Sequence, residues 1–456
     1  MGELVHVDAL GADGTYHTRR RLDITCVAGE KVGEISLASP LYVRRTMAAL
    51  RTAPVARASD RFTMLERAAD IYLNGTVGGM DADQYARTVS LVSGVPMSVV
   101  RDSVIGVADT LRALRRTAGL AMPVGAVADW DDPRTKSGSA VWTRKGEVFT
   151  VLASGNTPAV HGLWPEALAL GYKVAVRPSN REPFTAYRLI SALREAGFGN
   201  DVVALLPTDH QTADVLVSEA DYAMVYGGQD VVDKYAGSPR VLPQGPGRCK
   251  VLVTKDVDWR EKVDLIAGAV SHLGGTACIC TTAVLVEGDP APLAAALAEK
   301  LSRIPSLPAD DPTAVLTVQQ REQADRIDQH LRTVAHGTRA WLGGNGIVDQ
   351  LPSGGVVLRP AVHEVSSPDA SQLDVELPFP CVWVGPWSPE DGITPLRRSL
   401  AVTAMTEDRD LIGSLLREPT VTNVYLGDNP TTWIRPGVPH DGYLGEFLMR
   451  TKAVIR

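Results

Sequence analysis

The chain has 456 residues, of which 45% are hydrophobic, and its formal net charge at pH 7 is -7. A single hydrophobic core usually stops growing below this length, so we expect two or more domains. The negative charge argues against nonspecific binding of nucleic acid, and no apolar run reaches the roughly 18 residues of a membrane helix. The N-terminus lacks a basic flank and an apolar stretch, so we expect no signal peptide. Five cysteines are an odd and sparse set, which favours the reducing cytoplasm over a disulfide scaffold.

The first part of the chain predicts helices and then an exposed arm. In 59–75, apolar residues at helical spacing predict an amphipathic helix, which Ser59 caps and Gly75 ends. Another long helix is expected in 98–121. The stretch 126–144 is rich in turn residues and poor in periodic apolar residues. We therefore expect it to form an exposed hairpin or arm.

From residue 148 onward, apolar strands and helical patterns alternate. The helical pattern in 158–170 places Val160, Leu163, Trp164 and Ala167 on one face. Short loops and regular alternation predict a parallel, doubly wound α/β sheet, which binds its ligands at the carboxyl ends of the strands. The four predicted strands are 148–154, 173–178, 201–207 and 221–228. A second α/β region is expected from about residue 245, with further strands near 247–256 and 281–288.

Two cysteines, Cys278 and Cys280, lie in the stretch GGTACICTTAV. A metal clip is disfavoured because no CxxC motif or spaced histidine pair accompanies them, so we expect no metal. A reducing compartment disfavours a disulfide. A thiolate nucleophile and an ordinary buried cysteine both remain as readings for Cys278. If the following strand already includes both residues, their side chains share a face, and Cys280 is interpreted as a packing residue.

Several motifs in the same order resemble the aldehyde dehydrogenase superfamily, from about residue 30 to the C-terminus. ASGNTPAVHGLWPEALALGYKVAVRPSN resembles the family's cofactor-binding stretch, with Asn156, Pro158 and Trp164 at the expected spacing. GTACICTTAVLV resembles the segment that carries the nucleophile, and VELPFP resembles the Glu-x-Phe-x-Pro element. The resemblance implies a Rossmann-type cofactor domain (1–125 and 145–244) and a second α/β catalytic domain (245–430). It also implies a small β oligomerisation arm and tail (126–144 and 431–456).

The resemblance also implies roles for individual residues. Cys278 would be the nucleophile that attacks a carbonyl carbon. Asn156 would donate a hydrogen bond to the oxyanion, together with the backbone N–H of the nucleophile. The glycine turn after the fourth strand would let backbone N–H groups approach a pyrophosphate. The implied cofactor-binding residues are Ser154, Arg177, Ser179, Asn180, Gly227, Gly228 and Glu376, the last holding the nicotinamide ribose.

One departure from the family pattern concerns the cofactor. Aldehyde-oxidising members end a Lys-Pro-Ser-Glu motif with an acid that holds the adenosine ribose, whereas this chain has Arg177 and Asn180 at the first and last positions. An acid there would repel a 2′-phosphate, while arginine is a good partner for one. The sequence therefore predicts a preference for NADPH, with NADH possible.

A second departure concerns the fate of the thioacyl group. Oxidising members carry a glutamate that activates water, but the matching stretch VLPQGPGRCK places Pro243 or Gln244 there. Neither side chain is a general base at neutral pH. With ELPFPCVWVGP and PHDGYLGEFL, this absence resembles the acyl-reducing branch, which includes bioluminescence-type fatty acyl reductases and reductase partners in bacterial aryl-acid reduction.

We therefore predict that the chain reduces an activated carboxylic acid to an aldehyde. The donor would be an acyl-CoA or an acyl adenylate, and an adenylate would require a ligase partner. The first alternative is oxidation of an aldehyde with NAD(P)+, with water activated by a residue that the sequence does not reveal. The second is a non-catalytic scaffold member, which the retention of Asn156 and Cys278 disfavours. The resemblance implies a homodimer or homotetramer.

Overall fold

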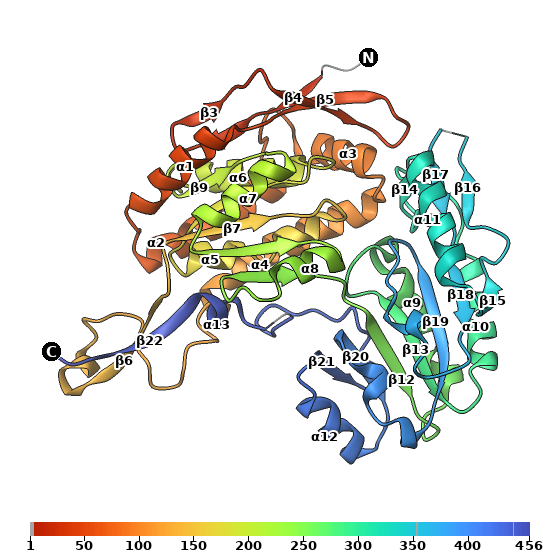
Figure 1. Ribbon diagram of the computed structural model, residues 1–456. Helices are drawn as coiled ribbons and strands as arrows, with labels where there is room; N and C mark the ends of the chain where they lie inside the picture. The colour runs from red at the N-terminus through yellow and green to blue at the C-terminus, as the bar shows by residue number, and fades with distance from the viewer. Residues whose placement is uncertain (1–3, 353, 441) are drawn as a thin grey trace.

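The computed structural model of the chain describes residues 4–352, 354–440 and 442–456. The first three residues of the predicted cofactor domain, residue 353 of the predicted catalytic domain and residue 441 of the predicted tail lie outside these ranges. Two seven-stranded sheets organise the molecule into two lobes, and a two-stranded arm projects from the first lobe (Figure 1).

The first sheet has the strand order β11-β10-β7-β8-β9-β2-β3. The five strands from β11 to β9 are parallel, as the alternating sequence predicts, and an antiparallel N-terminal hairpin extends one edge. The chain runs outward from β7 through β8 to β9 and then returns to β10 on the other side of β7. The strand order thus reverses between β7 and β10, which is where doubly wound sheets bind ligands. The strands are β2 (Ala9–Gly11), β3 (Gly14–Tyr16), β7 (Val148–Leu152), β8 (Lys173–Arg177), β9 (Val203–Leu205), β10 (Tyr222–Tyr226) and β11 (Val241–Gln244).

Helices cover both faces of this sheet. Helices α1 and α7 pack on one face, and α2, α4, α5 and α6 build the thicker layer on the other, where Tyr72, Trp164 and Phe184 are fully buried. Burial on both faces explains why the strands read as continuous apolar runs. The helices of this lobe are α1 (Pro40–Thr52), α2 (Ala58–Asn74), α3 (Ala82–Ser93), α4 (Met97–Thr117), α5 (Pro165–Ala169), α6 (Phe184–Glu195), α7 (His210–Glu219) and α8 (Gln229–Tyr235).

Two local predictions in this lobe were wrong. The single helix expected over 158–170 is a 3-10 turn (Pro158–His161) followed by the short α5. Pro165 has no N–H to continue a preceding helix, and it begins α5 instead, where the missing donor costs nothing. Ser59 is not the cap of α2, because Arg57 occupies that position without a side-chain capping bond; Gly75 does end the helix.

The second sheet has the order β15-β18-β19-β13-β12-β20-β21, and all but β15 are parallel to their neighbours. Alternate residues of its central strands face two separate cores. Helices α9 (Val263–Ser271) and α10 (Ala291–Ser302) close one core, and α11 (Arg321–Val334) and α12 (Arg409–Arg417) close the other. The strands are β12 (Cys249–Val253), β13 (Thr281–Glu287), β15 (Arg339–Leu342), β18 (Ala361–Glu364), β19 (Cys381–Trp387), β20 (Ser399–Met405) and β21 (Val421–Leu426).

The remaining strands form small accessory sheets. In the arm, β6 (Ser139–Arg144) pairs antiparallel with β22 (Met449–Val454), so the predicted arm and tail meet in one ribbon next to α13 (Leu444–Leu448). The other two sheets are β1 (Val5–Val7), β5 (Lys31–Ser36) and β4 (Arg21–Thr25), and β14 (Val318–Gln319), β17 (Val356–Leu358) and β16 (Val348–Gln350).

The helices of the described ranges differ from membrane-spanning helices in length or composition. No single helix there has the length and apolar composition to cross a membrane. Helices α3 and α4 meet these criteria only when taken together, and the chain bends by 120° between them.

Candidate active site

Cys278 lies in a loop between a 3-10 turn (His272–Gly275) and β13. It is half-buried, whereas the other four cysteines are buried. The turn before it is tight, since Leu273 and Gly274 both have positive φ values of 49° and 72°. Because β13 begins only at Thr281, the two cysteines precede the strand, and the expected shared strand face is not formed.

The two nearest cysteines to Cys278 are packing residues. The Cys280 thiol donates to the His272 carbonyl at 3.1 Å, and the Cys249 thiol donates to the Cys278 carbonyl at 3.2 Å. Burial raises the pKa of Cys280 to about 12 and that of Cys249 well above its ordinary value. Neither thiol ionises near neutral pH, which leaves the half-buried Cys278 as the candidate nucleophile of the three. No group of three or more His, Cys, Asp or Glu residues in the described parts of the chain is arranged to hold a metal ion.

Asn156 comes from the first lobe and reaches the Cys278 loop in the second. Its amide Nδ2 donates to the Thr276 carbonyl at 3.0 Å. The Ser154 hydroxyl donates to Asn156 Oδ1 at 2.7 Å, which orients the amide. An amide nitrogen carries two hydrogens, so one remains for a second acceptor beside the nucleophile. The structure thus brings Asn156 to the loop that carries Cys278, and it places Ser154 on the amide of Asn156.

Gly247 and Glu376 lie against the same loop. A Cβ atom at Gly247 would come within 1.7 Å of the Cys278 carbonyl oxygen and 3.1 Å of its Cα, so the two backbones are in direct contact. One step along the chain, the Arg248 N–H donates to Glu376 Oε2 at 2.9 Å. Burial is the largest cause that raises the pKa of Glu376, to about 7, against hydrogen bonds from the Arg248 and Gly247 backbone. Glu376 is therefore a half-buried carboxyl at the peptide that touches the nucleophile.

The segment carrying Glu376 is held on its N-terminal side. Lys250, almost fully buried on β12, donates to Asp374 at 2.8 Å and to the Arg397 carbonyl at 3.0 Å. The Trp383 indole donates to the Val375 carbonyl at 2.9 Å. Breaking a buried ion pair from one side leaves an uncompensated charge and is strongly destabilising. These contacts leave the backbone before Glu376 little freedom.

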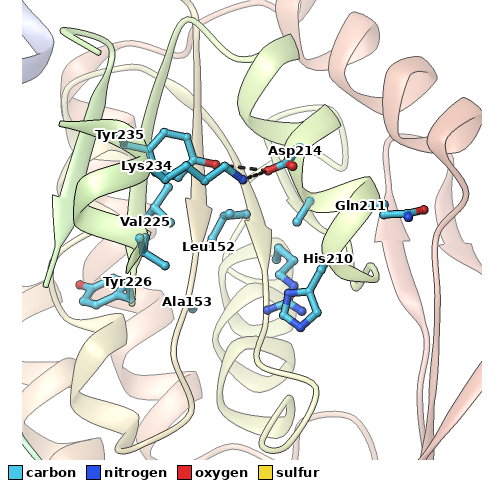
Figure 2. Close-up of a pocket in the computed structure, with 12 residues that line it drawn as sticks. Leu152, Ala153, His210, Gln211, Asp214, Val225, Tyr226, Lys234 and Tyr235 are labelled. Atoms are coloured by element: carbon cyan, nitrogen blue, oxygen red, sulfur yellow. Dashed lines mark hydrogen bonds and ion pairs between the residues drawn. The ribbon is translucent and has the colours of Figure 1, made fainter. Parts of the chain in front are cut away.

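A cavity of about 330 Å³ opens at the carboxyl ends of β7, β8 and β10, at the reversal of strand order (Figure 2). On one side, Lys234 of α8 pairs with Asp214 of α7 at 2.6 Å, and the Tyr235 hydroxyl also reaches Asp214 at 3.3 Å. The sequence analysis missed these residues, because nothing in their spacing marks them before the helices are packed. The lining residues are Leu152, Ala153, Arg177, His210, Gln211, Ala213, Asp214, Val225, Tyr226, Val231, Lys234 and Tyr235.

Arg177, which lines this cavity, and two further residues of the first lobe have unpaired polar atoms. One of the terminal nitrogens of Arg177 donates to the Thr208 carbonyl at 3.3 Å. Arg177 Nε, Asn180 Oδ1 and Thr208 Oγ1 are buried without a hydrogen-bond partner. Buried polar groups normally find partners, so these three atoms fit a bound molecule with hydroxyl or phosphate oxygens. Burial lowers the pKa of the Arg177 guanidinium, which the negative charge of Asp209 partly opposes.

The other predicted cofactor residues have different surroundings. Gly228 has open space where a Cβ would stand, whereas a Cβ at Gly227 would come within 2.4 Å of the Val231 side chain. Gly227 is therefore required by packing, and Gly228 leaves room for a ligand. The Ser179 hydroxyl accepts the Arg181 N–H at 3.2 Å and packs against Gly155, so it shapes the turn after β8.

Arg248 is a further residue that the sequence analysis did not identify. Its side chain donates to Gln229, the first residue of α8 and the neighbour of Gly228, and its Nε is buried without a partner. Its backbone N–H meanwhile binds Glu376. Arg248 thus links the glycine turn of the first lobe to the Cys278 region of the second. It adds another unsatisfied donor at the expected pyrophosphate position.

Comparison with known proteins agrees with this architecture. The family model described as the aldehyde dehydrogenase family matches residues 18–443. The chain superposes on the NAD-dependent aldehyde dehydrogenase of Sinorhizobium meliloti with a TM-score of 0.84, at 18% identity over 99% of this chain and 95% of the other. The chain therefore belongs to the aldehyde dehydrogenase family and has its α/β fold.

The relatives found by sequence match over a smaller part of the chain. An aldehyde-dehydrogenase-like protein of Sinorhizobium fredii is 24% identical over 277 residues, covering 57% of this chain and 52% of that protein. The chain thus spans about half the length of this relative. The N-succinylglutamate 5-semialdehyde dehydrogenase of Yersinia pseudotuberculosis is 26% identical over 386 residues, covering 78% of this chain and 72% of that protein.

Proposed function

We propose that the chain oxidises a small aldehyde with NAD(P)+ through a thioester on Cys278. The hydrogen bond from the Asn156 amide to the Thr276 carbonyl supports this proposal, because it holds the expected oxyanion donor of one lobe against the loop that carries Cys278 in the other. The name of the Yersinia relative, a semialdehyde dehydrogenase, supports an aldehyde that carries a second polar end.

The residues have these roles in the proposed mechanism. Cys278 Sγ attacks the aldehyde carbon, and the carbonyl oxygen takes up the negative charge. Asn156 Nδ2 and the backbone N–H of Cys278 stabilise this oxyanion in a partly desolvated site, where preorganised donors are most effective. When bound, NAD(P)+ supplies the acceptor for the hydride, which leaves a thioester on Cys278. Hydrolysis of that thioester releases the acid and restores the thiol.

The cavity and its unpaired atoms support a nucleotide cofactor in the first lobe. We propose that Arg177, Asn180 and Thr208 hold the adenosine ribose, and that Gly228 and Arg248 lie at the pyrophosphate. Arg177 favours a 2′-phosphate, as the sequence predicts, but Asp209 beside it and Asp214 in the cavity wall oppose one. The preference for NADP(H) over NAD(H) thus stays a prediction.

Reduction of an activated acid is the second candidate. It is favoured by the residues at the family's water-activating position, where β11 ends in Pro243 and Gln244. The Gln244 carbonyl accepts the Gly227 N–H at 3.0 Å, so this segment supports the glycine turn and supplies no acid. In this direction Cys278 accepts the acyl group from a CoA thioester or an acyl adenylate, the latter made by a partner ligase, and releases an aldehyde.

One experiment separates the two directions. NAD(P)+ reduction is measured with a panel of aldehydes and semialdehydes, and NAD(P)H oxidation with acyl-CoAs and ligase-generated acyl adenylates. Turnover of free aldehyde without CoA supports the first proposal. Turnover of activated acyl donors alone supports the second. Absence of both activities, with no covalent labelling of Cys278, supports a non-catalytic member.

The domain division and the assembly are proposals of the same kind. The strands β11 and β12 belong to different sheets, which supports a boundary near residues 244–245. In the ribbon, Val127 bridges the outer side of β6, whereas β22 pairs only with β6 among the strands of the described residues. An unpaired strand edge is ready to pair with another chain. We propose that this arm forms a homodimer or homotetramer, which sedimentation of the intact chain and of a chain lacking the β22 strand would test.

A further inference from the structure

Glu376 lies beside the loop that carries the nucleophile. Its carboxylate accepts N–H groups from the peptides of Gly247 and Arg248. The Gly247 backbone is in direct contact with the backbone of Cys278. The backbone of Gly247 and Arg248 therefore contacts the Glu376 carboxyl and also the loop that carries the nucleophile.

The pKa values of the two thiols near Cys278 also respond to the charge of Glu376. Burial raises the pKa of Cys249 most, followed by the Cys278 thiol and then by the negative charge of Glu376. The charge of Glu376 is also among the causes that raise the pKa of Cys280. Cys280 follows Cys278 in the loop, and Cys249 binds the Cys278 carbonyl. The carboxyl is thus close to thiols on both flanks of the nucleophile.

The carboxyl also has the properties of a base. It is half-buried, and its two hydrogen bonds from backbone N–H groups set its orientation. The cation facing it is Arg248, and the thiols facing it are Cys249 and Cys280, while the adjacent Asp374 is already paired with Lys250 and Arg398. A carboxyl with a pKa of about 7 is half ionised at neutral pH, where it both accepts and releases a proton readily.

We propose that Glu376 is the general base that activates the water which hydrolyses the thioester on Cys278. This role rests on the proposed function and takes the place of the acid that is missing at Pro243 and Gln244. Glu376 removes a proton from water as the water oxygen bonds to the thioester carbon. The tetrahedral intermediate collapses, its carbon–sulfur bond breaks, and the carboxylic acid is released. The departing thiolate takes up the proton from Glu376, so the enzyme returns to its starting state.

A cofactor-free assay isolates this step. An activated aryl ester, 4-nitrophenyl acetate, acylates a reactive thiol and releases coloured nitrophenolate, and water must then remove the acetyl group. In the unmodified chain we expect a burst of about one equivalent per Cys278, followed by steady release. In Glu376→Gln the burst remains, because the amide still accepts the Arg248 N–H. The steady phase falls by about 10²- to 10⁴-fold, the usual contribution of a general base, and mass spectrometry shows acetyl-Cys278 accumulating.

Glu287→Gln is the matched control. Glu287 also accepts a backbone N–H, from Lys255 at 3.0 Å, but it stands at the far end of β13. We expect it to retain both phases. In the unmodified chain the steady phase rises with pH as one group near pH 7 ionises, and this rise is lost in Glu376→Gln.

The outcomes are distinguishable. If Glu376→Gln keeps the full steady phase, or slows burst and steady phase equally, Glu376 is not the hydrolytic base, although Cys278 remains the nucleophile. A role confined to the nicotinamide ribose leaves this assay unchanged, because no cofactor is present, and that result also overturns the inference. If the unmodified chain forms no adduct on Cys278 and oxidises no aldehyde, the proposed function itself fails.

Discussion

Replacing Gly247 by alanine tests the contact on which the site geometry depends. Gly247 has no positive φ, so its own backbone accepts an alanine without strain. The added Cβ would stand 1.7 Å from the Cys278 carbonyl oxygen, 2.6 Å from the carbonyl carbon and 3.1 Å from Cα. Atoms of this kind essentially never approach within 3.0 Å, so the two backbones must separate by more than 1 Å.

The expected effect follows from that displacement. A misplacement of about 1 Å at a reacting group costs on the order of 100-fold in rate. Overpacking of a well-packed site costs about 1–3 kcal/mol of stability. We therefore expect kcat/KM for aldehyde oxidation to fall by about 100-fold or more in Gly247→Ala, and the acylation of Cys278 by 4-nitrophenyl acetate to slow with it. The free energy of unfolding would fall by about 1–3 kcal/mol.

Gly268→Ala is the control for this experiment. Gly268 lies in α9, just before the nucleophile loop, and nothing stands within 4 Å of the position of its Cβ. Alanine there should be neutral or stabilise the helix by about 0.5–1 kcal/mol. If Gly247→Ala retains kcat/KM within about threefold of the unmodified chain, the close contact with Cys278 does not position the nucleophile.

Three further predictions concern single side chains. Cys278→Ala should abolish covalent labelling by an activated ester, whereas Cys280→Ala should keep it; mass spectrometry of the intact chain distinguishes the two. Arg177→Gln should weaken NADP+ binding by about 10- to 100-fold, the value of a charge-assisted hydrogen bond, and NAD+ binding much less; equal losses in calorimetry would contradict a 2′-phosphate contact. Because burial raises the pKa of Glu376 from 4.5 to about 7, its ionisation destabilises the fold as pH rises through that range. The free energy of unfolding of Glu376→Gln should therefore exceed that of the unmodified chain by almost nothing below pH 4.5 and by at most about 3 kcal/mol above pH 7. Unfolding midpoints that shift equally at all pH values would refute this.

Local sequence determined the parallel strands, because a strand buried on both faces must be a short apolar run. VFTVLAS and KVAVRP therefore predicted neighbouring strands, β7 and β8, of the first sheet. The order of several motifs also identified the family. By contrast, the helix expected over 158–170 was interrupted, since Pro165 starts a helix more readily than it continues one.

Contacts between residues far apart in the chain were decided only by the tertiary structure. Asn156 meets Thr276, Gly247 meets Cys278, and Arg248 meets Glu376, each across the packing of separate elements. Residue types and their spacing in the sequence do not predict such contacts. In the sequence, the family pattern predicts the water-activating acid at Pro243 or Gln244, and its absence there favours reduction. The fold instead brings the carboxyl of Glu376, which follows Cys278 by 98 residues in the sequence, to the peptides beside the nucleophile loop, because strands distant in the chain lie side by side in one sheet.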